Sequence, residues 1–349
     1  MNFQWFMQKM INIHCLLLII KITNKGVINM NIKKIGLTAL AGSLVATSAF
    51  AGSMSVSGGA SFEVQHVGGG AANAGKAYSM GNSVTFTGSG ELENGLNVSI
   101  SMELDQAAAD GTNGVFDSHS VKVGNDSFGT LTFSGHGGSS AQSAVDDMAS
   151  GDIWDNGFGA TGAPTSSTSN NMMSYALPSL MDGLSANISF VPQTGASSQY
   201  ASTMDWAVAY TGVEGLTLGY SSGENKTTKG SEADVSTYYV TYAYGPVTVA
   251  FAETEYDSES TTTTADQDFT AYSVAYTVSD EISIAYKVAD LSTPNATGDL
   301  DQEVSGVTAS YTTGGMTISG KMINADNIAF ASADTSDQSM WELAASFAF

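Results

Sequence analysis

Residues 269–289 alternate between two kinds of side chain at every second position. Tyr272, Val274 and Tyr276 are separated by Ala, Ser and Thr, and Ile282 resumes the alternation after a break at residues 279–281. A period of two belongs to a β-strand, so this stretch predicts a hairpin with one apolar face. The other face is small and hydroxylated, whereas a soluble sheet would carry long charged residues there. That difference favours a wall with lipid on one side and water on the other.

Charge is distributed unevenly along the 349 residues. All 34 acidic residues follow residue 51, together with only six of the lysines and no arginine, so the segment from Gly52 onward has a formal net charge of −28. Such a field excludes nucleic acid as a partner and disfavours anionic ligands. The only cysteine, Cys15, precedes this segment, which therefore has neither disulfides nor thiolate chemistry.

Residues 30–51 have the organisation of a secretory signal peptide. Lys33 and Lys34 form a basic region, residues 35–46 an apolar region, and residues 49–51 a small-x-small cleavage site. We expect the mature protein to be exported and to begin at Gly52. Residues 1–29 precede a complete signal, and we interpret them as an over-extended start.

From Gly52 onward, short breaks rich in Gly, Asn and Asp alternate with longer polar segments. Tight hairpin turns require residues of these types. The pattern predicts one domain over residues 52–349, an all-β transmembrane antiparallel barrel of 16 strands with short periplasmic turns and long extracellular loops. The turns are expected at residues 93–95, 126–129, 182–183, 214–215, 245–246, 280–281 and 314–315, and the loops at about residues 67–81, 105–118, 136–169, 192–204, 222–234, 257–268, 290–303 and 325–337.

The lysines test this assignment, because a lysine that faces lipid at mid-membrane costs about 2–4 kcal/mol. Three lysines fall in predicted strands, and the alternation places them on the polar face: Lys122, Lys287 and Lys321. The remaining lysines, Lys76, Lys226 and Lys229, are assigned to loops. One predicted strand fits less well, since its apolar face continues into Glu253 and Glu255. We expect that end to project above the membrane.

Several motifs occur in a characteristic order over residues 30–349. A Phe-Gly-Thr-Leu-Thr strand at residues 128–132 leads into the longest loop, and a strand with Tyr175 and Pro178 follows it. The last strand alternates up to the terminal Phe349. Together with the signal peptide and the strand number, these features resemble the general porins of Gram-negative bacteria, most nearly the alphaproteobacterial type.

The resemblance implies an outer-membrane location and a homotrimer embedded in lipid. It implies that the third long loop, from His136 to about Ser169, folds into the lumen and narrows it. It also implies that Phe349 belongs to a signal read by the barrel-assembly machinery. Porins of this type usually set wall arginines against carboxylates of the loop, whereas this chain has no arginine.

A barrel of this size leaves an aqueous channel unless something plugs it. Four acids of the long loop are candidates for a pore constriction that favours cations electrostatically and limits solute size. The alternative is that they are solvated on an outer loop. Trp154 and Phe158 are available to anchor the loop to the wall. The four acids are Asp146, Asp147, Asp152 and Asp155.

Inward-facing charges on the wall complete the candidate site. Lys122, Lys287 and Lys321 could form a reduced positive wall opposite the loop, or be scattered solvated lysines. The alternation also places Glu103 and Glu342 on the inward face. They either pair with lysines or add to the negative charge of the lumen.

We therefore expect a passive diffusion channel for small hydrophilic solutes and ions that prefers cations, with no chemical step and no cofactor. A substrate-specific channel, a non-conducting structural or adhesive barrel, and a secreted β-solenoid are the alternatives. The widely spaced histidines indicate no catalytic triad. Acid pairs in the loops could bind calcium, or be merely solvated. These pairs are Asp299 with Asp301 and Asp266 with Asp268.

Overall fold

The computed structural model divides the chain into two compact units, Met1–Ala51 and Gly52–Phe349. The first unit, with the expected signal peptide, lies outside the described residues. In the part that is described, no helix is long and apolar enough to cross a membrane. The described residues are 52–69, 75–105, 116–154, 159–166, 170–192, 201–226, 232–260, 266–293, 301–331 and 336–349.

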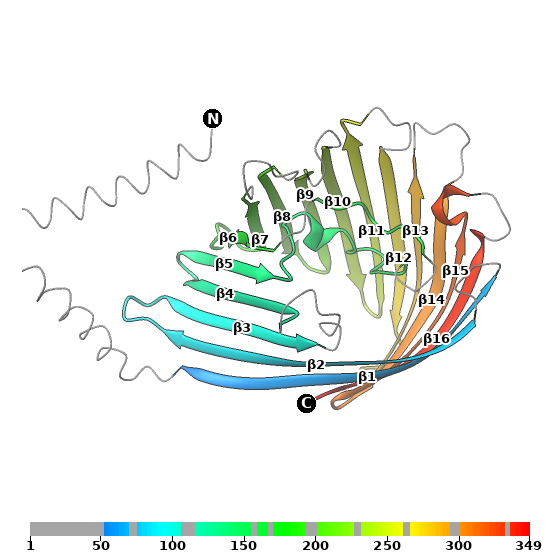
Figure 1. Ribbon diagram of the computed structural model, residues 1–349, viewed down its shortest axis with the longest axis horizontal. Coiled ribbons are helices and arrows are strands. Elements are labelled where there is room, and N and C mark those ends of the chain that lie inside the picture. The colour runs from blue at the N-terminus through cyan, green and yellow to red at the C-terminus, as the bar shows by residue number, and fades with distance from the viewer. Residues whose placement is uncertain are drawn as a thin grey trace, which may run out of the picture. The chain divides into compact units, whose positions relative to one another are not determined.

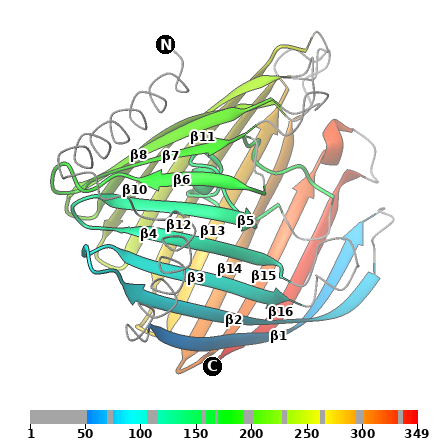
Figure 2. The same ribbon diagram turned by 60° about the vertical axis from the view of Figure 1, so that its left-hand side comes forward.

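The Gly52–Phe349 unit is a closed antiparallel β-barrel in which the order of the strands around the ring follows the order in the chain (Figures 1 and 2). The predicted fold class, including its 16 strands, is confirmed. The elements are β1 Ser53–Gly69, β2 Gly75–Glu91, β3 Asn97–Asp105, β4 Ser118–Asn125, β5 Gly129–His136, the 3-10 turn η2 Ser143–Val145, β6 Met172–Ala176, β7 Leu184–Val191, β8 Thr203–Val213, β9 Leu216–Asn225, β10 Ala233–Tyr244, β11 Val247–Ser258, β12 Gln267–Thr277, β13 Ile282–Ser292, β14 Gln302–Thr313, β15 Met316–Asp326, the 3-10 turn η3 Ile328–Phe330 and β16 Gln338–Ala348.

The barrel closes where β1 pairs with β16. The register runs from Gly59 opposite Ala348 to Gly69 opposite Gln338. Phe349 continues this ladder, since its N–H donates to the carbonyl of Gly58 at 3.0 Å and its carbonyl accepts from the Gly58 N–H at 2.8 Å. The last residue of the chain is therefore part of the seam that removes the free sheet edges.

The two faces of the wall differ as the alternation predicts. On β8, the Trp206 side chain is 41% exposed and its neighbour Ala207 only 6%. On β12, Tyr272 is 46% exposed and Ala271 only 1%. Large apolar side chains thus face outward, where a bilayer would cover them, and small ones face the interior.

The seven short turns lie between successive strands, as predicted. Gly215, for example, has a φ of 74°, a left-handed conformation that glycine adopts at little cost. The predicted long-loop boundaries are less accurate, because strands extend into polar segments where few apolar residues mark the alternation. Lys76, assigned to a loop, lies in β2 opposite His66, on the outward parity of Tyr78. That assignment was wrong, although Lys76 lies close to the loop end of its strand.

Candidate functional site: the lumen and the inward loop

Residues 137–171 connect β5 to β6, and the described part of this segment, which includes η2, lies within the ring of strands (Figure 1). We call this segment the inward loop; residues 155–158 and 167–169 of it are outside the described residues. Its backbone meets the inner wall at both sides. The Ala141 N–H donates to Ser189 Oγ of β7 at 2.8 Å. The Ala149 carbonyl accepts from Ser273 Oγ of β12 at 2.6 Å. The loop therefore folds into the lumen, as expected.

A buried polar network joins the inward loop to β8 and β10. Ser166 Oγ lies 2.6 Å from Ser140 Oγ and donates to Asp205 Oδ2 at 2.8 Å. Gln142 Nε2 donates to Thr237 Oγ1 at 3.0 Å, and its Oε1 accepts from the Ser166 N–H at 2.7 Å. All five residues are at most 2% exposed. A satisfied network in such a low-dielectric setting holds the loop in one position.

A second polar contact fixes the returning half of the loop. Gln302 of β14 accepts from the Thr161 N–H at 2.9 Å and donates to the Thr161 carbonyl at 2.8 Å. Gln302 is 1% exposed, so its amide has left water and depends on these bonds. The loop is consequently tied to strands on both sides of its turn at Gly151.

Apolar packing reinforces these bonds. Trp154 lies edge to face on Phe269 of β12, with ring centroids 5.1 Å apart. Both rings belong to a buried cluster that includes Ile153 of the loop, Leu291 of β13 and Val304 of β14. Trp154 thus anchors the loop to the inner wall, as its position in the sequence suggested. Phe158 lies outside the described residues.

Three of the four predicted constriction acids are described. Asp146 and Asp147 are half-buried, and Asp152 is exposed. Burial, together with repulsion from Asp147 and Asp152, raises the pKa of Asp146 to about 7. Asp146 is therefore close enough to the other two carboxylates to be affected by their charge. Asp155 lies outside the described residues.

Lys287 of β13 faces this acidic turn. A Cβ added at Gly151 would lie 3.2 Å from its Nζ, and Asp147 and Asp152 attract its ammonium group. One wall lysine therefore stands against two loop carboxylates. The chain has no arginine, so a lysine supplies the positive charge of the wall opposite the loop carboxylates.

Lys321 of β15 forms an ion pair with Glu342 of β16, with Nζ and Oε2 separated by 3.1 Å. Pairing was one of the two arrangements expected for Glu342. Lys321 is also near enough to Lys287 to repel it. The two lysines thus belong to one region of the wall, and a carboxylate offsets the charge of one of them.

The other two predicted wall charges lie elsewhere. Lys122 of β4 lines a cavity of about 510 Å³ together with Asn125 and Asp126, next to a short turn. Glu103 of β3 accepts from Ser118 Oγ at 3.0 Å. The sequence predicted the inward parity of these side chains, but the structure does not bring Lys122 into the Lys287 region.

A family model described as Gram-negative porin matches residues 36–293, well over half of the chain. The chain belongs to this family. Membership in the family and the barrel together indicate an outer-membrane channel for passive diffusion. Among curated proteins, none matches this porin in sequence.

Solved porin structures share the fold of this porin at low sequence identity. A multiply substituted porin from Rh. blastica is 16% identical, with a TM-score of 0.61, over 85% of this chain and 100% of the other. The anion-selective porin from Comamonas acidovorans is 15% identical, with the same TM-score and coverage. At such identities the likeness concerns the fold alone.

Within the described residues of this porin, no three His, Cys, Asp or Glu side chains come together as a metal site. Of the acid pairs considered for calcium, Asp299 is outside the described residues. Asp266 accepts from the Ser258 N–H at 3.0 Å, and Asp268 lies in β12. Calcium binding in the loops remains an untested prediction.

Sequence reasoning missed the residues that hold the inward loop of this porin, among them Gln142, Asp205 and Gln302. Asp205 carried a usable signal, because it is an acid of inward parity next to Trp206. The two glutamines gave no such signal in the sequence, because a polar residue in a polar segment cannot be distinguished from its neighbours until its partner is known.

Proposed function

We propose that this porin conducts small hydrophilic solutes and ions and prefers cations, with no chemical step and no cofactor. The carrying observation is the acidic turn of the inward loop, where Asp146, Asp147 and Asp152 interact within the lumen. Carboxylates at a narrow passage attract cations and repel anions. Lys287 offsets part of this charge, and Lys321 is itself offset by Glu342.

The preference for cations has to come from side chains, because the shared barrel fold by itself does not set ion selectivity. The Comamonas porin is anion-selective and has the same barrel. The present chain differs in having a formal net charge of −28 from Gly52 onward and no arginine. A field of this sign raises the local concentration of cations.

The test is the reversal potential of the purified protein in a planar bilayer under a KCl gradient. We expect the sign of a cation-selective pore, and a smaller magnitude when Asp146, Asp147 and Asp152 are all replaced by Asn. The charge-matched control combines Glu214→Gln, Asp280→Asn and Glu281→Gln, three exposed acids at turns between strands, and should leave the potential unchanged. Selectivity should also weaken at high salt, as the Debye length falls from about 8 Å to about 3 Å at 1 M.

Anion selectivity of the unaltered protein would refute the cation preference, whereas an absence of any conductance would refute the channel. The second result would favour the structural or adhesive barrel. An effect of the three-acid turn control equal to that of the loop variant would show that the loop acids have no special position at the constriction.

We further propose that the protein forms trimers through the outer face of β1–β7. Outward tyrosines are concentrated on β8–β16, where they form the aromatic belts expected at membrane interfaces. On β1–β7 the outward side chains are mostly aliphatic, such as Val56 and Ile100, which are 60% and 41% exposed. β6 has only five residues, too few to cross a bilayer at about 9–11 residues per strand. The wall at β6 is therefore too short for lipid and needs protein beside it.

Ile100→Trp tests this interface. A bulky ring on β3 should obstruct close packing and yield monomers, as measured by light scattering in detergent. Ile284→Trp on β13, at a residue of similar exposure (43%), should keep the trimer, because lipid accommodates the larger side chain. Trimers in both variants would place the interface elsewhere.

We also propose that export uses the signal at residues 30–51. Sequencing the amino terminus of protein isolated from outer membranes should show Gly52 first. An amino terminus within residues 1–30 would overturn this assignment without affecting the barrel.

A further inference from the structure

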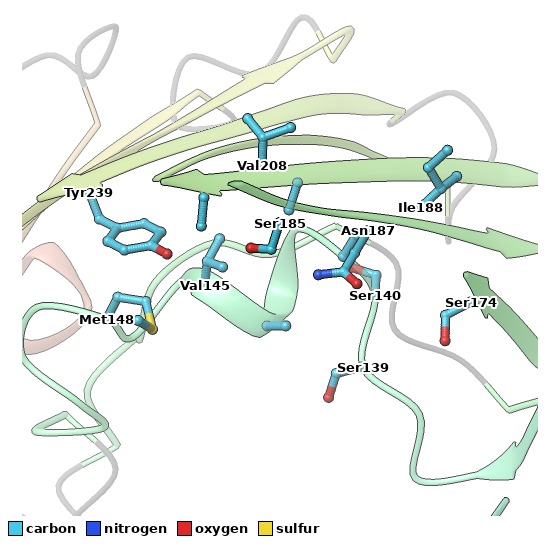
Figure 3. A pocket seen from close by; sticks show the side chains of 14 residues that line it. Ser139, Ser140, Val145, Met148, Ser174, Ser185, Asn187, Ile188, Val208 and Tyr239 are labelled. Carbon is cyan, nitrogen blue, oxygen red and sulfur yellow. The ribbon is translucent and has the colours of Figure 1, made fainter. Parts of the chain in front are cut away.

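A cavity of about 360 Å³ lies between the η2 turn of the inward loop and the inner wall of β6–β10 (Figure 3). Ser185, Asn187 and Tyr239 point into it from the wall, while Val145 and Met148 face it from the loop. Its size falls within the range of small-molecule sites, about 300–1,000 Å³.

The lining residues carry no formal charge, although the barrel as a whole is strongly acidic. Asp146 and Asp147 lie between Val145 and Met148 in sequence, yet neither lines the cavity. A cation would find no carboxylate ligand here. An anion would find no positive partner and would be repelled by the neighbouring acids. The cavity therefore suits an uncharged solute.

The polar side chains of the cavity are available for binding. Ser139, Ser185 and Asn187 are exposed to the lumen. Within the described part of the chain, their side chains have no hydrogen-bond partner. Hydroxyl and amide groups both donate and accept, so they match a solute that presents several hydroxyl groups. Val145 and Met148 supply an apolar surface for the C–H groups of the same solute.

Tyr239 provides the most specific feature. Its side chain is only 6% exposed, and its ring covers Gly219 of β9, where a Cβ would collide with it. The hydroxyl points into the cavity between Val145 and Ser185 (Figure 3). No residue that the structure describes makes a hydrogen bond with this hydroxyl. The ring is buried while the hydroxyl itself is open to the cavity, so a molecule in the cavity can exchange a hydrogen bond with it.

We propose that this cavity is a binding station for a neutral polyhydroxylated solute of monosaccharide size on its way through the channel. The proposal deepens the proposed function and rests on it, since the solute must first enter a conducting pore. The fixed Tyr239 ring and its free hydroxyl orient the solute, and Asn187 and the serines satisfy its other hydroxyl groups.

The test is a titration of the single-channel current with D-glucose, using protein purified from outer membranes and a planar bilayer. A binding station predicts a saturable fall in current. Tyr239→Phe, which removes only the hydroxyl, should raise the half-saturating concentration by roughly five- to tenfold, the effect of one lost hydrogen bond. Tyr242→Phe, the same change on the outward face of β10, should have no effect. Urea, a neutral solute without hydroxyl groups, should not give saturation.

Three results would overturn the proposal. The current could fall only in proportion to the conductivity of the solution, which means that water alone fills the cavity. The two tyrosine variants could titrate alike, or urea could saturate as glucose does. In each case an open channel would still be observed, so the proposed channel function would survive. If the protein does not conduct at all, the channel function fails together with the binding station.

Discussion

Trp154 of the inward loop and Phe269 of β12 meet edge to face, with ring centroids 5.1 Å apart and ring planes at 86°. Their side chains are 9% and 1% exposed. Aromatic pairs in this geometry contribute about 0.5–1.5 kcal/mol beyond the burial of their surface. The position of the loop in the lumen therefore depends on packing as well as on hydrogen bonds.

Replacing Trp154 by Ala should loosen the loop and widen the passage. Loss of a buried aromatic side chain costs about 3–5 kcal/mol in a closed core, and less where water can fill the space. We expect a larger single-channel conductance than in the unaltered protein. Trp206→Ala, which removes an outward-facing indole of similar size, should leave the conductance unchanged. Equal conductance in the Trp154→Ala variant and the unaltered protein would show that the hydrogen bonds hold the loop without the indole.

Cation selectivity should depend on pH near neutrality. Burial raises the pKa of Asp146 to about 7, so this loop residue loses its charge as the pH falls from about 8 to about 6. We expect the reversal potential in a KCl gradient to shrink over that interval, and Asp146→Asn to remove the shrinkage. A pH dependence that persists in Asp146→Asn would assign the titration to another group.

The raised pKa of Asp146 also makes the stability of the barrel depend on pH. Because the folded value of about 7 exceeds the ordinary value of 3.8, the native state holds more protons than the unfolded chain between these limits. The contribution of Asp146 to stability is therefore present at low pH and is lost as the pH rises through this window. We expect Asp146→Asn to reduce the change in the free energy of unfolding across this pH window. Urea unfolding measured at several pH values would test this.

The Lys321–Glu342 pair allows the wall charge to be changed in either direction. Lys321→Met leaves Glu342 unpaired and should strengthen cation selectivity, whereas Glu342→Gln leaves Lys321 unpaired and should weaken it. The side chain of Lys321 is 27% exposed and that of Glu342 only 11%, so Lys321→Met, which leaves the more buried charge unpaired, should destabilise the barrel more than Glu342→Gln. Reversal potentials that shift in the same direction for both variants would contradict this account.

Phe349 should matter for assembly as well as for closure. Its ring lies against Gly58, where an added Cβ would be 2.8 Å from Cε2. Deleting Phe349 removes the last two ladder bonds to β1, and we expect less folded barrel in the outer membrane. Folding can be followed by the gel mobility of unheated samples. Phe347→Ala, which keeps the ladder and the terminal residue, is the control, and an equal loss of folded protein in both would argue against a terminal signal.

The period of two in the sequence, together with the turn residues, was sufficient to predict sixteen strands and their inward and outward faces. Tyr272 and Ala271 take opposite faces because of pleating alone, which is a local property. The ends of the strands were not predictable in the same way. Around Lys76 only Tyr78 and Met80 mark the outward face, among Gly, Ala and Ser residues. An alternation this short does not define a strand end, so the boundary depends on pairing with β1.

The sequence alone also determined the sign of the charge, the absence of arginine and the inward parity of Lys287 and Lys321. Only the tertiary structure decided where the inward loop rests. Gln302 bonds to Thr161 across 141 positions in the chain, and Gln142 to Thr237 across 95. Such contacts exist only in the closed barrel, which brings distant strands around one lumen. No local pattern in the sequence encodes them, because each partner is an ordinary polar residue until the other lies beside it.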